Sequence, residues 1–227
     1  MTDSEKRIII DAFLNKDYKI IINSFSYERR KELFRSIEQL GDEIENELGT
    51  VIPDIDGDNF IASFFTNDEA ISYFYETDDV DIKRDLMYCI SDDDLKIELI
   101  KEDRTLTFSI LKTLSSDEKL LEAIYNLDDS FRDACFYSFI KYFRSDENKL
   151  KYVEDAQINE LNMLQALIES LNDIDLKYYA FNKYIKNNYP KYEKYELFQL
   201  INSIDDPKVK ISKLNEFVDD YINNKFF

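Results

Sequence analysis

Four carboxylates near the C-terminal end of the sequence have the spacing of a metal site. Glu193 and Glu196 are three residues apart, and so are Glu216 and Asp219. Because residues three apart lie on one face of a helix, each pair would present two carboxylates to the same side. On two antiparallel neighbouring helices, the four groups could hold one or two Mg²⁺ ions and activate water for phosphate chemistry.

This ExxE…ExxD pattern is similar to the signature of all-α nucleotide pyrophosphatases. The resemblance implies a Mg²⁺-dependent hydrolase with these four carboxylates as metal ligands. It covers residues 193–219 only, and the basic and polar nucleotide contacts of that family are not evident. In a chain with 48 acidic residues among 227, solvated helix faces produce the same spacing. We therefore favour an interpretation with no catalytic, cofactor-binding or metal residue and no cofactor.

Other catalytic patterns are missing from the sequence. The chain has no histidine, which removes Ser-His-Asp and Cys-His nucleophile arrangements and most zinc sites. With only three glycines, it has no glycine-rich phosphate loop. The acidic run at residues 78–81 misses the DDxxD prenyl-diphosphate pattern, because Ile82 occupies the position of the last carboxylate. The sequence thus favours a protein that is not an enzyme.

The net charge of −19 limits the possible partners. It repels phosphate backbones and anionic lipids, so we expect neither direct nucleic-acid binding nor membrane association. The most basic segment, Tyr27–Arg35, alternates cations with glutamates, and we interpret it as a solvated helix face with i,i+4 pairs. An acidic N-terminal segment and the lack of a membrane-length apolar run predict a cytoplasmic location, in the protein's own cell or in a host.

The composition predicts an all-α fold. Three glycines and three prolines leave few positions for tight turns, and 44% hydrophobic residues are too many for a disordered chain. Abundant Ile, Asn, Lys, Tyr and Phe are typical of AT-rich genomes, including those of phages and large DNA viruses.

Apolar residues recur at three- and four-residue spacing along most of the chain, which predicts short helices. We expect one continuous domain with four parts: an N-terminal helical segment (1–50), an irregular loop and entry helix (51–66), helical repeats (67–173) and a C-terminal helical segment (174–227). Outside the repeats we expect helices at 4–22, 27–48, 174–187, 190–203 and 207–224, and a main loop at 49–60. For the helix at 4–22, the sequence leaves open a break near Asn15.

The repeats are predicted from recurring helix starts. Segments that begin at Asn67, Ser91, Ser116 and Ser145 each open with a capping residue and an acidic first turn, 24, 25 and 29 residues apart. A second helix at Asp128–Phe143 matches the segment Asp78–Ile90. Arg132–Asp133 aligns with Arg84–Asp85, 48 residues earlier, which is two units of 24. The fold we expect is an array of short antiparallel helix pairs, an irregular α-solenoid.

Asp128, Asp129, Arg132 and Ala134 at the start of that second helix resemble the corresponding positions of HEAT-type α-helical repeat proteins. The resemblance covers about residues 67–173, and the units are shorter than the roughly 40–47 residues of HEAT repeats. It implies a scaffold for binding proteins.

Three functional hypotheses follow. The first is an interaction protein whose acidic surface binds a basic protein partner or a second copy of itself. The second is a nucleic-acid mimic that inhibits a DNA- or RNA-binding protein by presenting carboxylates along one face. The third is the Mg²⁺-dependent hydrolase built on Glu193, Glu196, Glu216 and Asp219.

Overall fold

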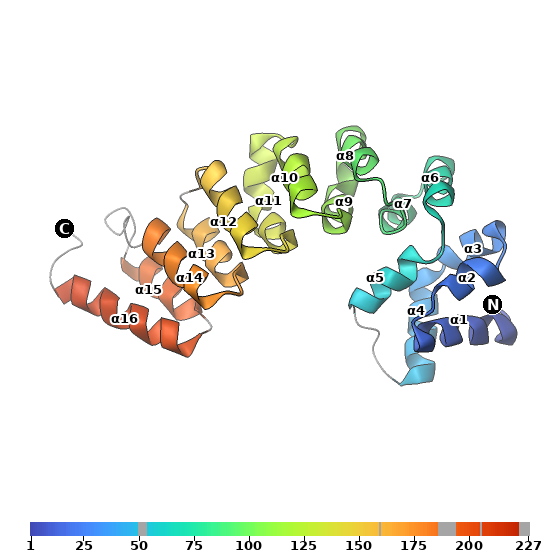
Figure 1. Cartoon of the computed structure of the whole chain (residues 1–227), viewed down its shortest axis with the longest axis horizontal. Coiled ribbons are helices and arrows are strands. Elements are labelled where there is room, and N and C mark those ends of the chain that lie inside the picture. Colours follow the sequence, from blue (N-terminus) through green and yellow to red (C-terminus); the bar gives the residue numbers. More distant parts are fainter. Residues whose placement is uncertain (50–53, 159, 186–193, 205, 223–227) are drawn as a thin grey trace. The chain divides into compact units, whose positions relative to one another are not determined.

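The computed structural model describes residues 1–49, 54–158, 160–185, 194–204 and 206–222. In these ranges the chain forms sixteen α-helices and no strand, which confirms the all-α prediction (Figure 1). The helices fall into two compact units, Met1–Ser115 and Ser116–Phe227.

The first unit contains the helices coloured blue to green in Figure 1. They are α1 (Asp3–Asn15), α2 (Lys19–Ser24), α3 (Tyr27–Phe34), α4 (Ile37–Leu48), α5 (Asp54–Ala62), α6 (Asn67–Glu76), α7 (Val80–Leu86), α8 (Asp93–Glu102), the short 3₁₀ helix η1 (Arg104–Leu106) and α9 (Thr107–Thr113).

The helix expected at 4–22 is two helices, with the break after Asn15 that the sequence left open. Two other expectations for this unit are corrected. The helix predicted at 27–48 breaks at Ser36, whose hydroxyl donates to the Glu32 carbonyl, a contact that is typical of bent helices. The loop predicted at 49–60 is wrong from Asp54 onward, where α5 begins. Phe60 of α5 is buried against the rings of Phe13 and Phe64, and this packing holds the segment in place despite its internal glycine.

The second unit contains α10 (Asp117–Tyr125), α11 (Asp129–Tyr142), α12 (Asp146–Asp155), α13 (Leu161–Ser170), α14 (Ile174–Ala180), a π-helical continuation η2 (Phe181–Ile185), α15 (Lys194–Ser203) and α16 (Pro207–Ile222). The three helices expected at the C-terminal end are present. Residues 190–193 of the second of them lie outside the described ranges.

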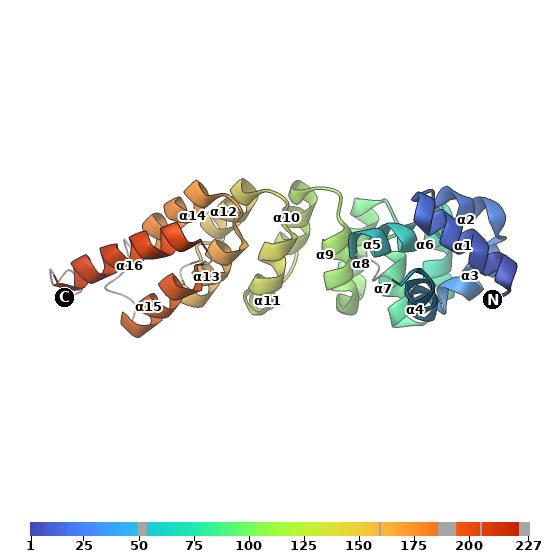
Figure 2. The ribbon, with the colours of Figure 1, turned by 90° about the horizontal axis from the view of Figure 1, so that it is seen from below.

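Helix pairs recur within each unit, as α6/α7 and α8/α9 in the first and α10/α11 in the second (Figures 1 and 2). In the second unit α12 is joined to α13 by the hydrogen bond from Lys149 to the Ser170 carbonyl. The first helices α6, α8, α10 and α12 begin within two residues of the predicted starts, and each has a side-chain cap, from Thr66, Asp92, Ser116 and Ser145. The second helices also pack on one another, α5 on α7 and α7 on α9, then α11 on α13 and α13 on α15. The predicted array of short helix pairs is therefore present in both units.

A hydrogen-bonded contact that we name the entry link connects successive pairs. The first residue of each first helix accepts hydrogen bonds from the backbone that leads into the next first helix. The four entry links join Asn67 to Ser91 (2.8 Å from the backbone N–H), Asp93 to Ser115 (3.0 Å), Asp117 to Arg144 and Ser145 (2.9 and 3.0 Å), and Asp146 to Asn172 and Asp173 (2.6 and 2.8 Å).

The entry links of the second unit are buried. Burial alone would raise the pKa of Asp146, but the amide donors and the Lys149 ammonium, 2.9 Å away, outweigh it and hold the pKa below its usual value. The same ammonium donates to the carbonyl of Ser170, at the end of α13. In the first unit, the buried Lys96 likewise donates to the carbonyl of Thr113, at the end of α9. These lysines neutralise the negative ends of the second helices.

Candidate protein-binding groove

Three of the four carboxylates that the sequence suggested as a metal site lie on helices that pack together: Glu196 on α15, and Glu216 and Asp219 on α16. Glu196 and Asp219 are exposed, and Glu216 accepts from the buried Lys213 at 3.1 Å. Glu193 lies outside the described residues. In the ranges that are described, no three acidic, cysteine or histidine side chains gather closely enough to hold a metal ion. The four-carboxylate site stays a prediction.

The basic segment Tyr27–Arg35 forms α3 and the residue that follows it, and its cations are engaged by other helices. Arg29 makes a two-pronged ion pair with Glu5 of α1, with donor–acceptor distances of 2.8 and 3.0 Å. Arg30 is buried and makes a similar pair with Glu69 of α6, at 2.6 and 2.9 Å. The expected solvated face with pairs within one helix is therefore wrong for Arg30. Both glutamates also close the capping boxes that start α1 and α6.

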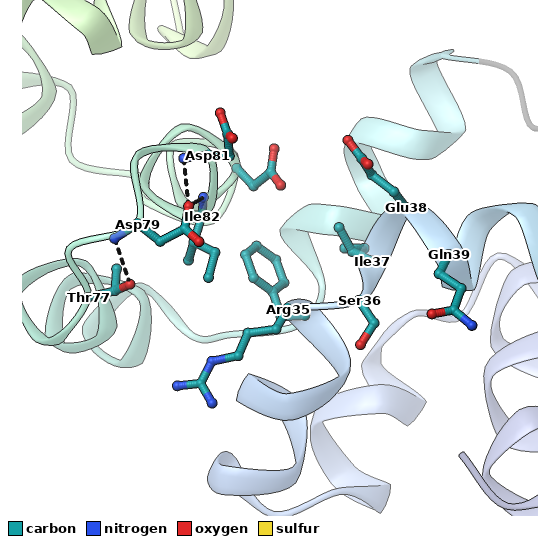
Figure 3. Close-up of a pocket in the computed structure, with 11 residues that line it drawn as sticks. Arg35, Ser36, Ile37, Glu38, Gln39, Thr77, Asp79, Asp81 and Ile82 are labelled. Carbon is teal, nitrogen blue, oxygen red and sulfur yellow. Dashed lines mark hydrogen bonds between the residues drawn. The ribbon is translucent and has the colours of Figure 1, made fainter.

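The same segment leads into a charged hollow of the first unit. The hollow has a volume of about 650 Å³ and lies between the turn that joins α3 to α4 and the start of α7 (Figure 3). Its lining combines apolar, acidic and polar side chains: Phe34, Arg35, Ser36, Ile37, Glu38, Gln39, Thr77, Asp79, Asp81, Ile82 and Asp85.

The residues that begin α7 form the acidic side of this hollow. Asp79 caps α7 and accepts from the backbone N–H groups of Asp81 and Ile82, at 3.0 and 3.3 Å. Asp81 lies in the first turn of α7, where a negative charge is favourable. Asp85 is one turn further along and faces the same side as Asp81. The segment that starts α7 therefore directs several carboxylates toward α4.

The charges of the hollow are unbalanced. Among its described lining residues, Arg35 is the only cation, and its guanidinium is directed away from Asp81 and Glu38 (Figure 3). Its Nε donates instead to the Tyr73 hydroxyl, at 3.2 Å. Asp81 is paired with Arg84 of its own helix, 2.7 Å away. The other carboxylates of this hollow, Glu38, Asp79 and Asp85, make no ion pair among the described residues.

The pKa of Asp85 reflects this excess of negative charge. Burial, together with the nearby carboxylates of Glu38, Asp81 and Asp79, raises its pKa to about 6. No donor in the described part of the chain hydrogen-bonds to its carboxyl group. A cation that entered the hollow would favour the ionised form of Asp85 and reduce the repulsion among its neighbours.

A second hollow, of about 540 Å³, continues along α4 toward α5. It shares Ile37, Glu38 and Asp85 with the first, and it adds Asp42, Glu45, Asp58, Phe60 and Ile61 among others. Asp58 receives the Lys112 ammonium at 3.3 Å. We name the two hollows together the acidic groove. Seven carboxylates line it: Glu38, Asp42, Glu45, Asp58, Asp79, Asp81 and Asp85.

The sequence contained part of the signal for this groove. The run at residues 78–81 is acidic, but it lacks the last carboxylate of the diphosphate motif, and its carboxylates are also typical of a helix start. What the sequence pattern lacked was the proximity of α4 to α7, which depends on the break at Ser36 and on the packing of α5 against α7.

The comparisons with known proteins identify no relative: no family model, no curated protein and no solved structure matches the chain. None of the described helices combines the length and apolar content that crossing a bilayer requires.

Proposed function

We propose that this protein is a non-enzymatic interaction protein, a scaffold of short helix pairs whose acidic groove binds a basic segment of another protein. The observation that carries the proposal is the composition of the groove wall. Seven carboxylates line it, and the guanidinium of Arg35 is turned away from the hollow. A lysine- or arginine-rich segment is the complementary partner.

The state of Asp85 supports a partner that brings positive charge. A carboxyl group whose pKa is raised by burial and by like charges gains free energy when a cation approaches. Binding of a basic segment near neutral pH would remove that penalty, so part of the binding energy comes from relief of repulsion already present in the free protein. The net charge of −19 also speeds the encounter with basic proteins and repels polyanions.

The nucleic-acid mimic and the Mg²⁺-dependent hydrolase remain hypotheses from the sequence. Nothing observed in the described residues favours either of them over a binding groove. Self-association is an alternative occupant of the acidic surface, and gel filtration at increasing protein concentration distinguishes it from binding to a basic partner.

The test uses a synthetic basic peptide of about 14 residues, in which Lys and Leu alternate at helical spacing. Its affinity is measured by fluorescence anisotropy for the full chain and for the double variant Glu38→Gln, Asp42→Asn. Both side chains are exposed on α4 and line the groove. We expect the affinity to fall by about 5-fold or more, and the remaining binding to be weakened by salt.

The matched control is Glu98→Gln, Glu102→Gln. These two glutamates are exposed on α8, so the control removes the same charge from the same unit outside the groove. We expect a loss of less than about 2-fold. Equal losses in the two double variants would mean that the peptide responds only to net charge, and the groove would then have no binding role.

A further inference from the structure

Two of the three glycines in the chain line the acidic groove. Gly41 lies inside α4 and Gly57 inside α5, and both belong to the second hollow. The third, Gly49, ends α4 with a positive φ of 65°, which explains why a glycine is present there. The two groove glycines need another explanation.

Neither backbone geometry nor internal packing requires glycine at positions 41 and 57. Of the glycines, only Gly49 has a positive φ. A Cβ atom placed on Gly41 or Gly57 would meet no atom of the described chain within 4 Å. Each glycine therefore faces open space in the groove, and an alanine would fit at either position in the free protein.

These glycines lower the stability of their helices. A glycine inside a helix is less favourable than alanine by about 1 kcal/mol, because it loses more backbone freedom on folding. A glycine face on a helix allows another backbone to approach more closely than any side chain would permit. The open space above Gly41 and Gly57 is a place where such an approach can occur.

We infer that the acidic groove receives one α-helix of a basic partner, and that the backbone of this helix lies against Gly41 and Gly57. The inference rests on the proposed function and specifies how the partner binds. The half-buried Ile61 of α5 offers an apolar contact for one face of the incoming helix. The carboxylates of the groove complement lysines or arginines on the flanks of that helix.

A helix fits this groove better than an extended segment does. An extended peptide gains its backbone hydrogen bonds from an open strand edge. The described residues contain no strand, and the walls of the groove are α4, α5 and α7 with the turn before α4. A helix satisfies its own backbone groups and needs only side-chain contacts and a close approach.

The experiment compares Gly41→Ala and Gly57→Ala with the unmodified chain, using the same Lys/Leu peptide. Each substitution should raise the urea midpoint of the free protein, because alanine favours the helix. Each should nevertheless weaken peptide binding by about 3- to 10-fold, since the methyl group occupies the space that the incoming backbone needs. Gly41→Leu should weaken it further.

Controls separate this inference from the proposed function. A peptide with the same composition but with D-residues alternating along it cannot form the helix, and we expect it to bind equally weakly to all variants. Unchanged helix binding in both alanine variants would overturn the close approach. If Glu38→Gln, Asp42→Asn still lost affinity, the groove would keep its proposed role. If the two alanine variants and the double variant Glu38→Gln, Asp42→Asn all kept full affinity, both proposals would fail.

Discussion

Aspartates have opposite roles in the two units of the molecule. In the second unit, Asp146 is buried with two backbone amides and an ammonium group around it, and its pKa lies below the usual value. In the first unit, Asp85 is half-buried beside other carboxylates and has no hydrogen-bond donor among the described residues, and its pKa is raised to about 6. An ionised aspartate therefore stabilises the fold at position 146 and destabilises it at position 85.

The difference shows that the 48 acidic residues are not equivalent in this fold. Carboxylates that receive donors from their own chain, such as Asp117 and Asp146, hold successive helix pairs together. Glu38 and Asp85 line a hollow and receive no hydrogen bond from the described residues, and under the proposed function a basic partner supplies their donors. Net charge alone does not distinguish the two groups, whereas their hydrogen-bond partners do.

The largest effect is expected from Asp146→Ala. The substitution leaves the amides of Asn172 and Asp173 without their acceptor and the buried Lys149 without its counter-charge. We expect the free energy of unfolding to fall by about 3 kcal/mol. Urea denaturation followed by circular dichroism measures it. Glu147→Ala, an exposed change in the same turn, is the control, and a similar loss there would contradict the structural role of the entry link.

A smaller loss is expected from Asp117→Asn. The asparagine side chain keeps one acceptor oxygen but lacks the charge that attracts the backbone N–H groups of Arg144 and Ser145. We therefore expect the free energy of unfolding to fall by about 1–2 kcal/mol at pH 7. Burial would raise the pKa of Asp117, but these donors and Asn148 hold it below its usual value.

The sign of the pH dependence follows from that lowered pKa. The stabilisation by ionised Asp117 is complete above the pKa of the unfolded chain, and it disappears as the pH falls through the lower pKa of the folded chain. The difference between the two proteins should therefore shrink once the pH falls below the usual aspartate pKa of about 4. A difference that stayed constant down to pH 2.5 would contradict a charge-dependent link.

Asp85→Asn should act in the opposite direction. Because the pKa of about 6 in the folded protein lies above the usual aspartate value, ionisation of Asp85 destabilises the fold as the pH rises toward 6 and beyond. We expect the variant to be more stable than the unmodified chain by about 1–2 kcal/mol at pH 7.5 and nearly equal to it at pH 3.5. Urea titrations at both pH values provide the measurement, and destabilisation at pH 7.5 would show that Asp85 has an unrecognised donor.

The smallest effect is expected from Asn67→Asp. This residue makes the one entry link with a neutral acceptor, to the N–H and hydroxyl of Ser91 at 2.8 and 3.1 Å. A carboxylate would strengthen both hydrogen bonds and favour the start of α6. We expect a gain of about 0.5 kcal/mol at pH 7, visible as a higher thermal midpoint. A loss would indicate that the Asn67 link differs from the three aspartate links in more than charge.

The sequence predicted the helix starts because their signals are local. The caps Ser116 and Ser145 and the acidic first turns after them fix where helices begin, whatever lies around them. Asp117 and Asp146 belong to the same acidic first turns. Their role in the entry links could not be predicted, because the amides that they accept from lie more than 25 residues away in the sequence.

The groove could not be predicted in the same way. Apolar spacing continues through Ser36, so periodicity gave one helix where two are present. Without that break, nothing placed Glu38 of α4 near Asp81 of α7. The raised pKa of Asp85 comes from burial and from neighbouring carboxylates, and these surround it only when α4 and α7 lie close together in the fold.

The central claim is that the acidic groove of the first unit, and not the linked carboxylates of the second, binds basic helices. The most direct measurement is a titration of ¹⁵N-labelled protein with the Lys/Leu peptide, followed by amide chemical shifts. We predict that the largest shifts fall in α4, in Gly57–Ile61 of α5 and at the start of α7, with little change around Asp117 and Asp146. Shifts spread evenly over acidic residues of both units would contradict the claim.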